Sequence, residues 1–72
     1  MIPPKGAKYR ARLRVVDEAG RLIHHGTCIY YFDADMQELG YHIVYDTRFH
    51  SHTAGRPWSA EFLDKYEITE VL

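Results

Sequence analysis

Apolar and polar residues alternate most regularly near the start of the chain. From residue 9 to residue 15 every second position is apolar, and Lys8, Arg10, Arg12 and Arg14 stand between those positions. Successive side chains of a β-strand point to opposite faces of a sheet. The spacing therefore predicts a strand over residues 9–17 with an apolar face turned inward and a basic face turned outward.

The residues that follow this strand predict a β-hairpin. Asp17 to Gly20 is a short acidic segment ending in glycine, which suits a tight turn with a positive φ at Gly20. We expect residues 21–32 to return antiparallel to the first strand. Gly26 interrupts the apolar pattern of this segment and predicts a bulge or a sharp bend. Residues 27–32 are rich in β-branched and aromatic side chains and predict a central strand.

Residues 33–57 carry signals of turns as well as of a strand. Asp35 and Glu38 have the spacing of a helix capping box and Gly40 that of a helix end, so residues 33–40 predict one helical turn or a turn-rich loop. Renewed alternation predicts a third strand over residues 41–49. Residues 50–57 lack apolar periodicity and predict a loop.

The end of the chain predicts a short helix and then a strand. Trp58, Phe62 and Tyr66 recur at every fourth position, which favours a helix over residues 57–66, although a strand is the alternative. Residues 67–72 predict a last strand. We expect its apolar residues to join the core: Ile68, Val71 and Leu72.

These elements define a fold class. The chain is expected to be mainly β (β-rich α+β), with a small three- to four-stranded antiparallel curved sheet or an SH3/OB-like partial barrel, and one or two short helical turns. A length of 72 residues predicts a single domain over residues 1–72, with residues 1–7 as a flexible lead-in. With 46% hydrophobic and 26% charged residues, the chain is too apolar for a disordered tail and too polar to span a bilayer.

Charge is distributed unevenly along the chain. The formal net charge is −1, but residues 1–32 hold six bases and two acids, whereas residues 33–72 hold eight acids and three bases. The two halves can neutralise each other within one small fold, or they can form a dipolar surface that orients a partner. The one cysteine, Cys28, cannot form an internal disulfide, so a reducing cytosol is expected.

The sequence gives little support to a metal site or an active site. Five histidines include the pair His50-x-His52, which would place two imidazoles on one side of an extended segment. The further ligands of a closed site would have to come from the remaining candidates: His24, His25, His42, Cys28 or Asp46. No paired ligand motif supports such a site, so no metal or cofactor is expected.

The candidate catalytic groups have simpler interpretations. Cys28 lies in an apolar run and reads as a small buried side chain, and the acids Asp33 and Asp35 are explained by capping of a turn. We therefore expect no enzyme activity.

Two surfaces remain as candidates for partner binding. The basic face of the first strand suits an acidic protein or, with Tyr30, Tyr31 and Tyr41 nearby, a single-stranded nucleic acid. Its arginines can also pair with acids of the same chain, for which Glu67, Glu70 and Asp64 are the candidates. The second surface is the loop from His50 through Trp58, and the indole of Trp58 is either an edge of the core or an interface anchor. The predicted contact residues are the cations and the indole of these surfaces: Lys8, Arg10, Arg12, Arg14, Arg56 and Trp58.

The sequence therefore favours one function and leaves two alternatives. The favoured function is a small, non-enzymatic protein-binding module of the cytoplasm, acting as an accessory or inhibitory subunit on a larger prokaryotic or phage-related machine. A nucleic-acid-binding domain that uses the basic strand is the first alternative. It ranks below protein binding because the acidic second half of the chain would repel phosphates. A histidine-dependent metal-binding protein or small enzyme is the second. No membrane partner is expected. An open sheet edge could add a strand of a partner or of a second copy, so a homodimer is also possible.

Overall fold

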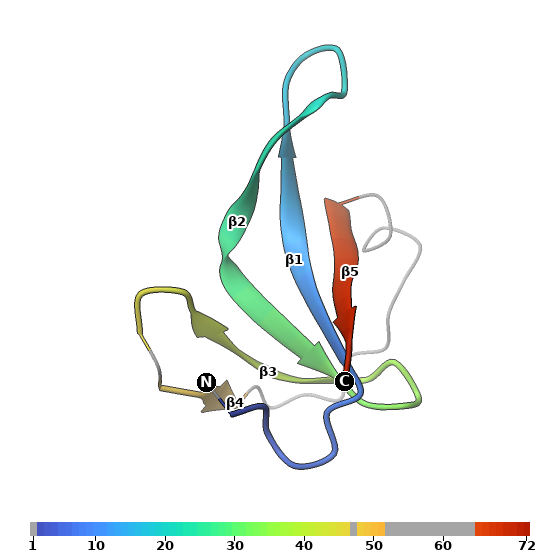
Figure 1. Cartoon of the computed structure of the whole chain (residues 1–72), viewed down its shortest axis with the longest axis vertical. Helices are drawn as coiled ribbons and strands as arrows, with labels where there is room; N and C mark the ends of the chain where they lie inside the picture. Colours follow the sequence, from blue (N-terminus) through green and yellow to red (C-terminus); the bar gives the residue numbers. More distant parts are fainter. Residues whose placement is uncertain (1, 47, 52–64) are drawn as a thin grey trace.

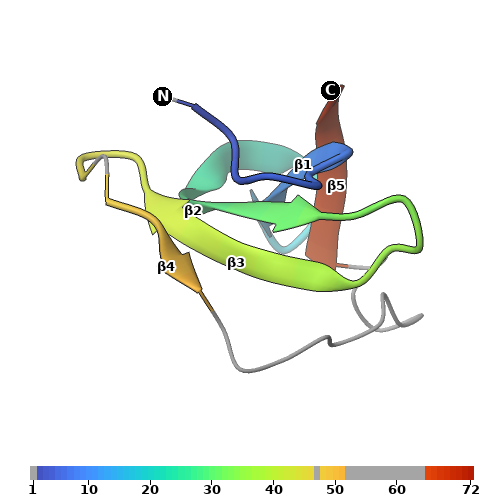
Figure 2. The same cartoon turned by 90° about the horizontal axis from the view of Figure 1, so that it is seen from below.

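The chain forms one open antiparallel sheet of five strands. The structure, a computed structural model, describes residues 2–46, 48–51 and 65–72. The strands are β1 (Tyr9–Val16), β2 (Leu22–Phe32), β3 (Glu38–Ile43), β4 (His50–Ser51) and β5 (Tyr66–Val71), and they are arranged in the order β4-β3-β2-β1-β5. The sheet is strongly coiled, so that β3 runs across the direction of β5 in both views (Figures 1 and 2). The mainly β class is confirmed, with five strands in place of the predicted three to four. The SH3/OB-like architecture stays a prediction.

The predicted hairpin joins β1 to β2 and is confirmed. The N–H of Gly20 donates to the Asp17 carbonyl at 3.0 Å, and the N–H of Asp17 donates to the Arg21 carbonyl at 2.9 Å. The Asp17 carboxylate accepts from the N–H groups of Ala19 and Arg21, both at 2.9 Å. Gly20 has a φ of +82°, as the turn requires. The hairpin extends well beyond the other strands (Figure 1).

A bulge interrupts β2 at Gly26, as the sequence predicted. Arg12 pairs with Ile29 and Arg14 with His25, so Leu13 alone stands opposite the three residues 26–28. The two extra residues preserve the faces of the strand, because side chains alternate with a period of two. The arginines of β1 consequently share one face with His25, Ile29 and Tyr31.

The helical turn predicted over residues 33–40 is wrong, and the alternative of a turn is correct. The carboxylate of Asp33 accepts from the N–H groups of Asp35 at 2.8 Å and Gln37 at 3.0 Å. Met36 has a φ of 62°, a left-handed conformation that a helix does not continue through. The cap is therefore Asp33, and Glu38 begins β3 instead of closing a capping box.

The third strand is displaced from its predicted position. β3 begins at Glu38 and ends at Ile43, where a turn closes with the N–H of Asp46 donating to the Ile43 carbonyl at 2.8 Å. The prediction of a loop from residue 50 is wrong for His50 and Ser51, which pair with β3 as β4. Of the helix predicted over residues 57–66, the structure describes only the last two residues: Lys65 is helical, and Tyr66 begins β5.

The buried hydrophobic core of the described residues lies on β1 and at the end of β2. Ala11, Tyr31 and Phe32 are its buried hydrophobic members. The predicted contribution of β5 is wrong for two residues, because Ile68 and Val71 remain 41% and 64% exposed at the edge of the sheet. The described part of the chain contains no helix long and apolar enough to cross a lipid bilayer.

Candidate interaction surfaces

The first arginine of the basic strand is held by partners from the same chain. In the sheet register, Arg10 lies opposite Tyr31 on β2 and opposite Glu70 on β5. Its Nη1 donates to the Glu70 carboxylate, and its guanidinium carbon lies 5.8 Å from the centre of the Tyr31 ring. The Arg10 side chain is only 24% exposed. The charge of Arg10 is therefore neutralised within the fold, and its guanidinium group covers the buried ring of Tyr31.

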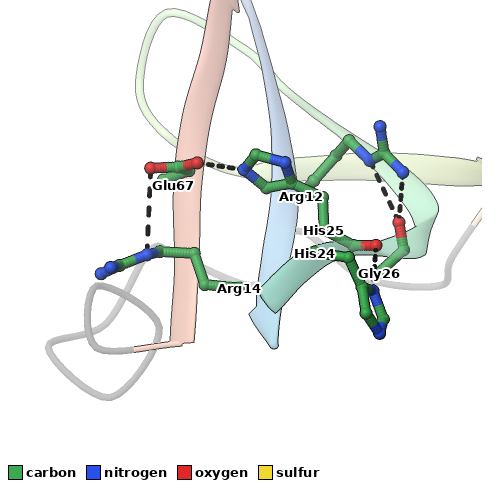
Figure 3. Close-up of polar contacts among 6 residues, drawn as sticks. All are labelled: Arg12, Arg14, His24, His25, Gly26 and Glu67. Carbon is green, nitrogen blue, oxygen red and sulfur yellow. Dashed lines mark hydrogen bonds and ion pairs between the residues drawn. The ribbon is translucent and has the colours of Figure 1, made fainter. Parts of the chain in front are cut away.

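The next arginine stabilises the bulge. Nε and Nη2 of Arg12 donate to the carbonyl of Gly26 at 3.0 and 2.6 Å (Figure 3). A bulge disrupts the ladder, and a half-buried carbonyl without a donor costs free energy. Arg12 supplies that donor through both arms of its guanidinium group.

A three-strand junction ties β5 to the hairpin (Figure 3). It consists of Arg14 from β1, His25 from β2 and Glu67 from β5. One carboxylate oxygen of Glu67 bonds to Nε2 of His25, and the other lies 3.9 Å from Nε of Arg14. The side chains of Arg14 and Glu67 are 37% and 42% exposed, so solvent screens the pair. The carboxylate holds the outermost strand against both strands of the hairpin.

These contacts show that two arginines of the predicted basic surface are paired within the chain. The alternative in which the arginines pair with acids of the same chain is confirmed for Arg10 with Glu70 and for Arg14 with Glu67. Lys8 is exposed beside them. Contact of these cations with a partner stays a prediction. The other two predicted contact residues, Arg56 and Trp58, lie outside the described residues.

Behind Arg10 lies a buried pair of a tyrosine and a histidine. The Tyr31 hydroxyl and Nδ1 of His42 are 2.9 Å apart, and both side chains are almost fully buried. The Phe49 ring packs edge-on against Tyr31, with ring centres 6.0 Å apart. Burial lowers the pKa of His42 below its usual range, and the positive charge of Arg10 lowers it further. The imidazole is therefore held neutral inside the fold.

Four aromatic rings form a row on the opposite face of the sheet. Tyr66 packs edge-on against Tyr30 at 5.1 Å, Tyr30 lies 5.9 Å from Tyr41, and Tyr41 stacks on His50 at 5.1 Å. Burial raises the pKa of Tyr30, and hydrogen bonds with Tyr66 and Cys28 raise it further. Tyr30 lies opposite Ala11 and Tyr41, on the face away from the arginines. The row and the basic side chains therefore lie on opposite faces of the sheet.

Large hydrophobic side chains are exposed at several places on the described part of the molecule, and two of these places lie on the β1–β2 hairpin and on β5. Near the hairpin tip, Val16, Leu22 and Ile23 are 43%, 45% and 62% exposed. On β5, the exposed residues are Ile68 and Val71. The sequence predicted the hairpin itself but not its exposed apolar surface, although apolar residues on both sides of the polar turn were a signal of it.

The histidines and the cysteine do not form the combinations considered from the sequence. No group of three potential metal ligands gathers among residues 2–46, 48–51 and 65–72. The pair His50-x-His52 extends outside that part of the chain. Nδ1 of His24 is 2.8 Å from the His25 carbonyl, and His25 contacts Glu67, so both rings have partners other than Cys28. Cys28 is a free thiol and is half-buried, where the sequence predicted a buried side chain.

No protein-family model, no curated protein and no solved structure matches the chain.

Proposed function

We propose that the chain is a small, non-enzymatic module of the cytoplasm that binds another protein and acts as an accessory or inhibitory subunit on a larger prokaryotic or phage-related machine. The observation that carries this proposal is the exposure of apolar side chains on the protruding β1–β2 hairpin. Ile23 is 62% exposed there, and Val16 and Leu22, which pair with each other across the two strands, are also exposed. Apolar side chains clustered on a projecting element are typical of protein-binding sites.

The electrostatics of the arginine face support a protein partner over a nucleic acid. Phosphate binding depends on cations that are free to replace counterions. Arg10 and Arg14 are instead paired with Glu70 and Glu67, and any phosphate near them would also meet these carboxylates. Stacking requires aromatic faces beside the cations, but Tyr30 and Tyr41 lie on the other face of the sheet and Tyr31 is fully buried.

Affinity purification from the native host tests the proposal. The bait is the full chain, compared with its Ile23→Asp variant, which places a charge in the exposed hairpin cluster. The matched control is Tyr45→Asp, because Tyr45 is 86% exposed and lies outside the hairpin and β5. We expect one stoichiometric protein partner that is lost with Ile23→Asp and kept with Tyr45→Asp. Recovery of no partner, or retardation of single-stranded oligonucleotides by the wild-type chain at low salt, contradicts the proposal.

A further inference from the structure

β5 is an edge strand of the sheet, and most of its residues are exposed. β5 ends the strand order and pairs with β1 on its inner side, and no other strand of the described residues lies along its outer side. Ile68, Thr69, Glu70 and Val71 are all exposed. An exposed edge of this kind can accept a further strand through its main-chain groups.

The main chain of β5 offers a donor and an acceptor at Val71. The N–H of Leu72 donates to the Lys8 carbonyl at 2.8 Å, and Val71 lies opposite Tyr9 in the same register. In an antiparallel pair, the residue next to a hydrogen-bonded position directs its own N–H and C=O away from the partner strand. The N–H and C=O of Val71 therefore face the outer edge of the sheet.

β1, which pairs with β5 on its inner side, shows which kind of strand can lie beside β5. β1 alternates arginine with apolar residues, and Arg10 and Arg14 reach the carboxylates of Glu70 and Glu67. Those carboxylates are still 52% and 42% exposed, so each retains room for another cation. Each side chain of a strand lies between the side chains of both neighbouring strands. A strand on the outer side would consequently meet acids on one face and the exposed Ile68 and Val71 on the other.

We propose that the outer edge of β5 binds an extended segment of a partner protein in which arginine or lysine alternates with apolar residues. The segment would add a sixth strand, with its cations beside Glu67 and Glu70 and its apolar side chains beside Ile68 and Val71. This inference rests on the proposed protein-binding function and names the chemistry of the partner. It also explains why this edge carries acids, which favour a basic strand and oppose an acidic one.

A second copy of the chain fits this edge less well. Antiparallel pairing of β5 with itself would bring Glu67 and Glu70 of one copy close to the same acids of the other. Like charges on facing strands are destabilising. The charge pattern therefore favours a basic segment from a different protein.

Binding of a synthetic peptide to the full chain tests the proposal. The probe is a short peptide in which arginine alternates with valine, and the control probe has glutamate in place of each arginine. Binding is followed by the amide signals of the chain in two-dimensional NMR and by fluorescence anisotropy of the labelled peptide. We expect shifts concentrated at Ile68–Val71 with the basic probe, and at least tenfold weaker binding of the acidic probe, a ratio equivalent to about 1.4 kcal/mol or more.

Two variants at one position test whether the edge itself is used. Val71→Pro removes the outward-facing N–H while leaving the inner hydrogen bonds of β5, because proline is compatible with a strand position whose N–H faces solvent. Val71→Thr keeps the N–H and is the matched control. We expect Val71→Pro to weaken binding of the basic probe about tenfold or more relative to Val71→Thr, with both variants showing the amide dispersion of the folded sheet.

The outcomes separate this inference from the function on which it rests. Absence of binding, shifts confined to the arginine face, equal affinity for both probes, or concentration-dependent dimerisation through β5 overturns the edge-strand proposal. If the chain still captures a partner that depends on Ile23 while Val71→Pro binds it normally, the edge-strand proposal fails and the protein-binding function stands. If the basic probe binds as expected, Val71→Pro is also expected to lose the native partner.

Discussion

Replacement of Gly40 by alanine tests how closely β4 packs on β3. Gly40 has a φ of +150°, a region that residues with a side chain rarely adopt. A Cβ atom at this position would meet the His50 carbonyl oxygen, would lie 2.5 Å from Cζ of Phe49, and would lie 3.0 Å from Cα of Ser51. Gly40 pairs with Ser51 in the sheet, so the added methyl group has to push β4 away or distort β3.

The expected cost has two parts. Backbone strain at an unfavourable φ contributes about 1–3 kcal/mol. Forcing an extra methyl group into a filled space costs about 1–3 kcal/mol more. The sum of roughly 2–6 kcal/mol is a large share of the total stability, which for a chain of this length is about 4–10 kcal/mol.

Gly20→Ala is the matched control, because it separates strain from crowding. Gly20 also has a positive φ, of +82°, but an added Cβ there has no atom within 4 Å. We expect this control to lose only about 1 kcal/mol. Urea unfolding followed by far-ultraviolet circular dichroism gives both free energies. If Gly40→Ala is no more destabilising than Gly20→Ala, the close packing of β4 on Gly40 is refuted.

Three further predictions concern the buried pair and the three-strand junction. Burial lowers the pKa of His42 in the folded state, so as the pH falls the imidazole is protonated in the unfolded chain before it is protonated in the folded one. The free energy of unfolding should therefore fall as the pH drops below about 6.5, and a pH series of urea unfolding in which His42→Gln shows the same decline contradicts this. Tyr31→Phe removes the hydroxyl that bonds to the buried imidazole and should cost about 1–3 kcal/mol in urea unfolding, so an unchanged midpoint would refute the pairing. Glu67→Gln should lower the free energy of unfolding by less than about 1 kcal/mol, because the carboxylate is half exposed. A double-mutant cycle with His25→Gln that gives a coupling energy of several kcal/mol would contradict this weak interaction.

The sequence predicted the first half of the sheet well, because its signals there are local. Alternation defined β1, and the glycine in the turn defined the hairpin. The bulge followed from Gly26 breaking an apolar run. Each of these features depends on residues near one another in the chain.

The second half was harder to predict because its boundaries depend on tertiary contacts. Asp33, rather than Asp35, became the cap because Met36 adopts a left-handed conformation. The two residues of β4 adopt a strand conformation because they pair with β3. No local sequence pattern predicts that pairing. The apolar residues of β5 were expected in the core, but a strand at the edge of a sheet leaves such side chains exposed.

The arginine face shows the same limit at the level of function. Alternation placed Arg10, Arg12 and Arg14 together on one face, which the register confirms. Whether those cations were free depended on the register of β5, which brings Glu67 and Glu70 beside them from the far end of the chain. Long-range strand pairing of this kind is set by the whole fold, so composition alone left both interpretations open.

Amide hydrogen exchange of the chain, alone and in complex with its captured partner, tests the central claim most directly. We expect the partner to add protection at the β1–β2 hairpin, around Ile23, and along the outer edge of β5, above all at Val71. The amides that join β1 to β2 and to β5 should keep the protection that they have in the free chain. Added protection confined to residues 9–14, or the same pattern produced by single-stranded nucleic acid, would contradict a protein-binding module that uses the hairpin and the sheet edge.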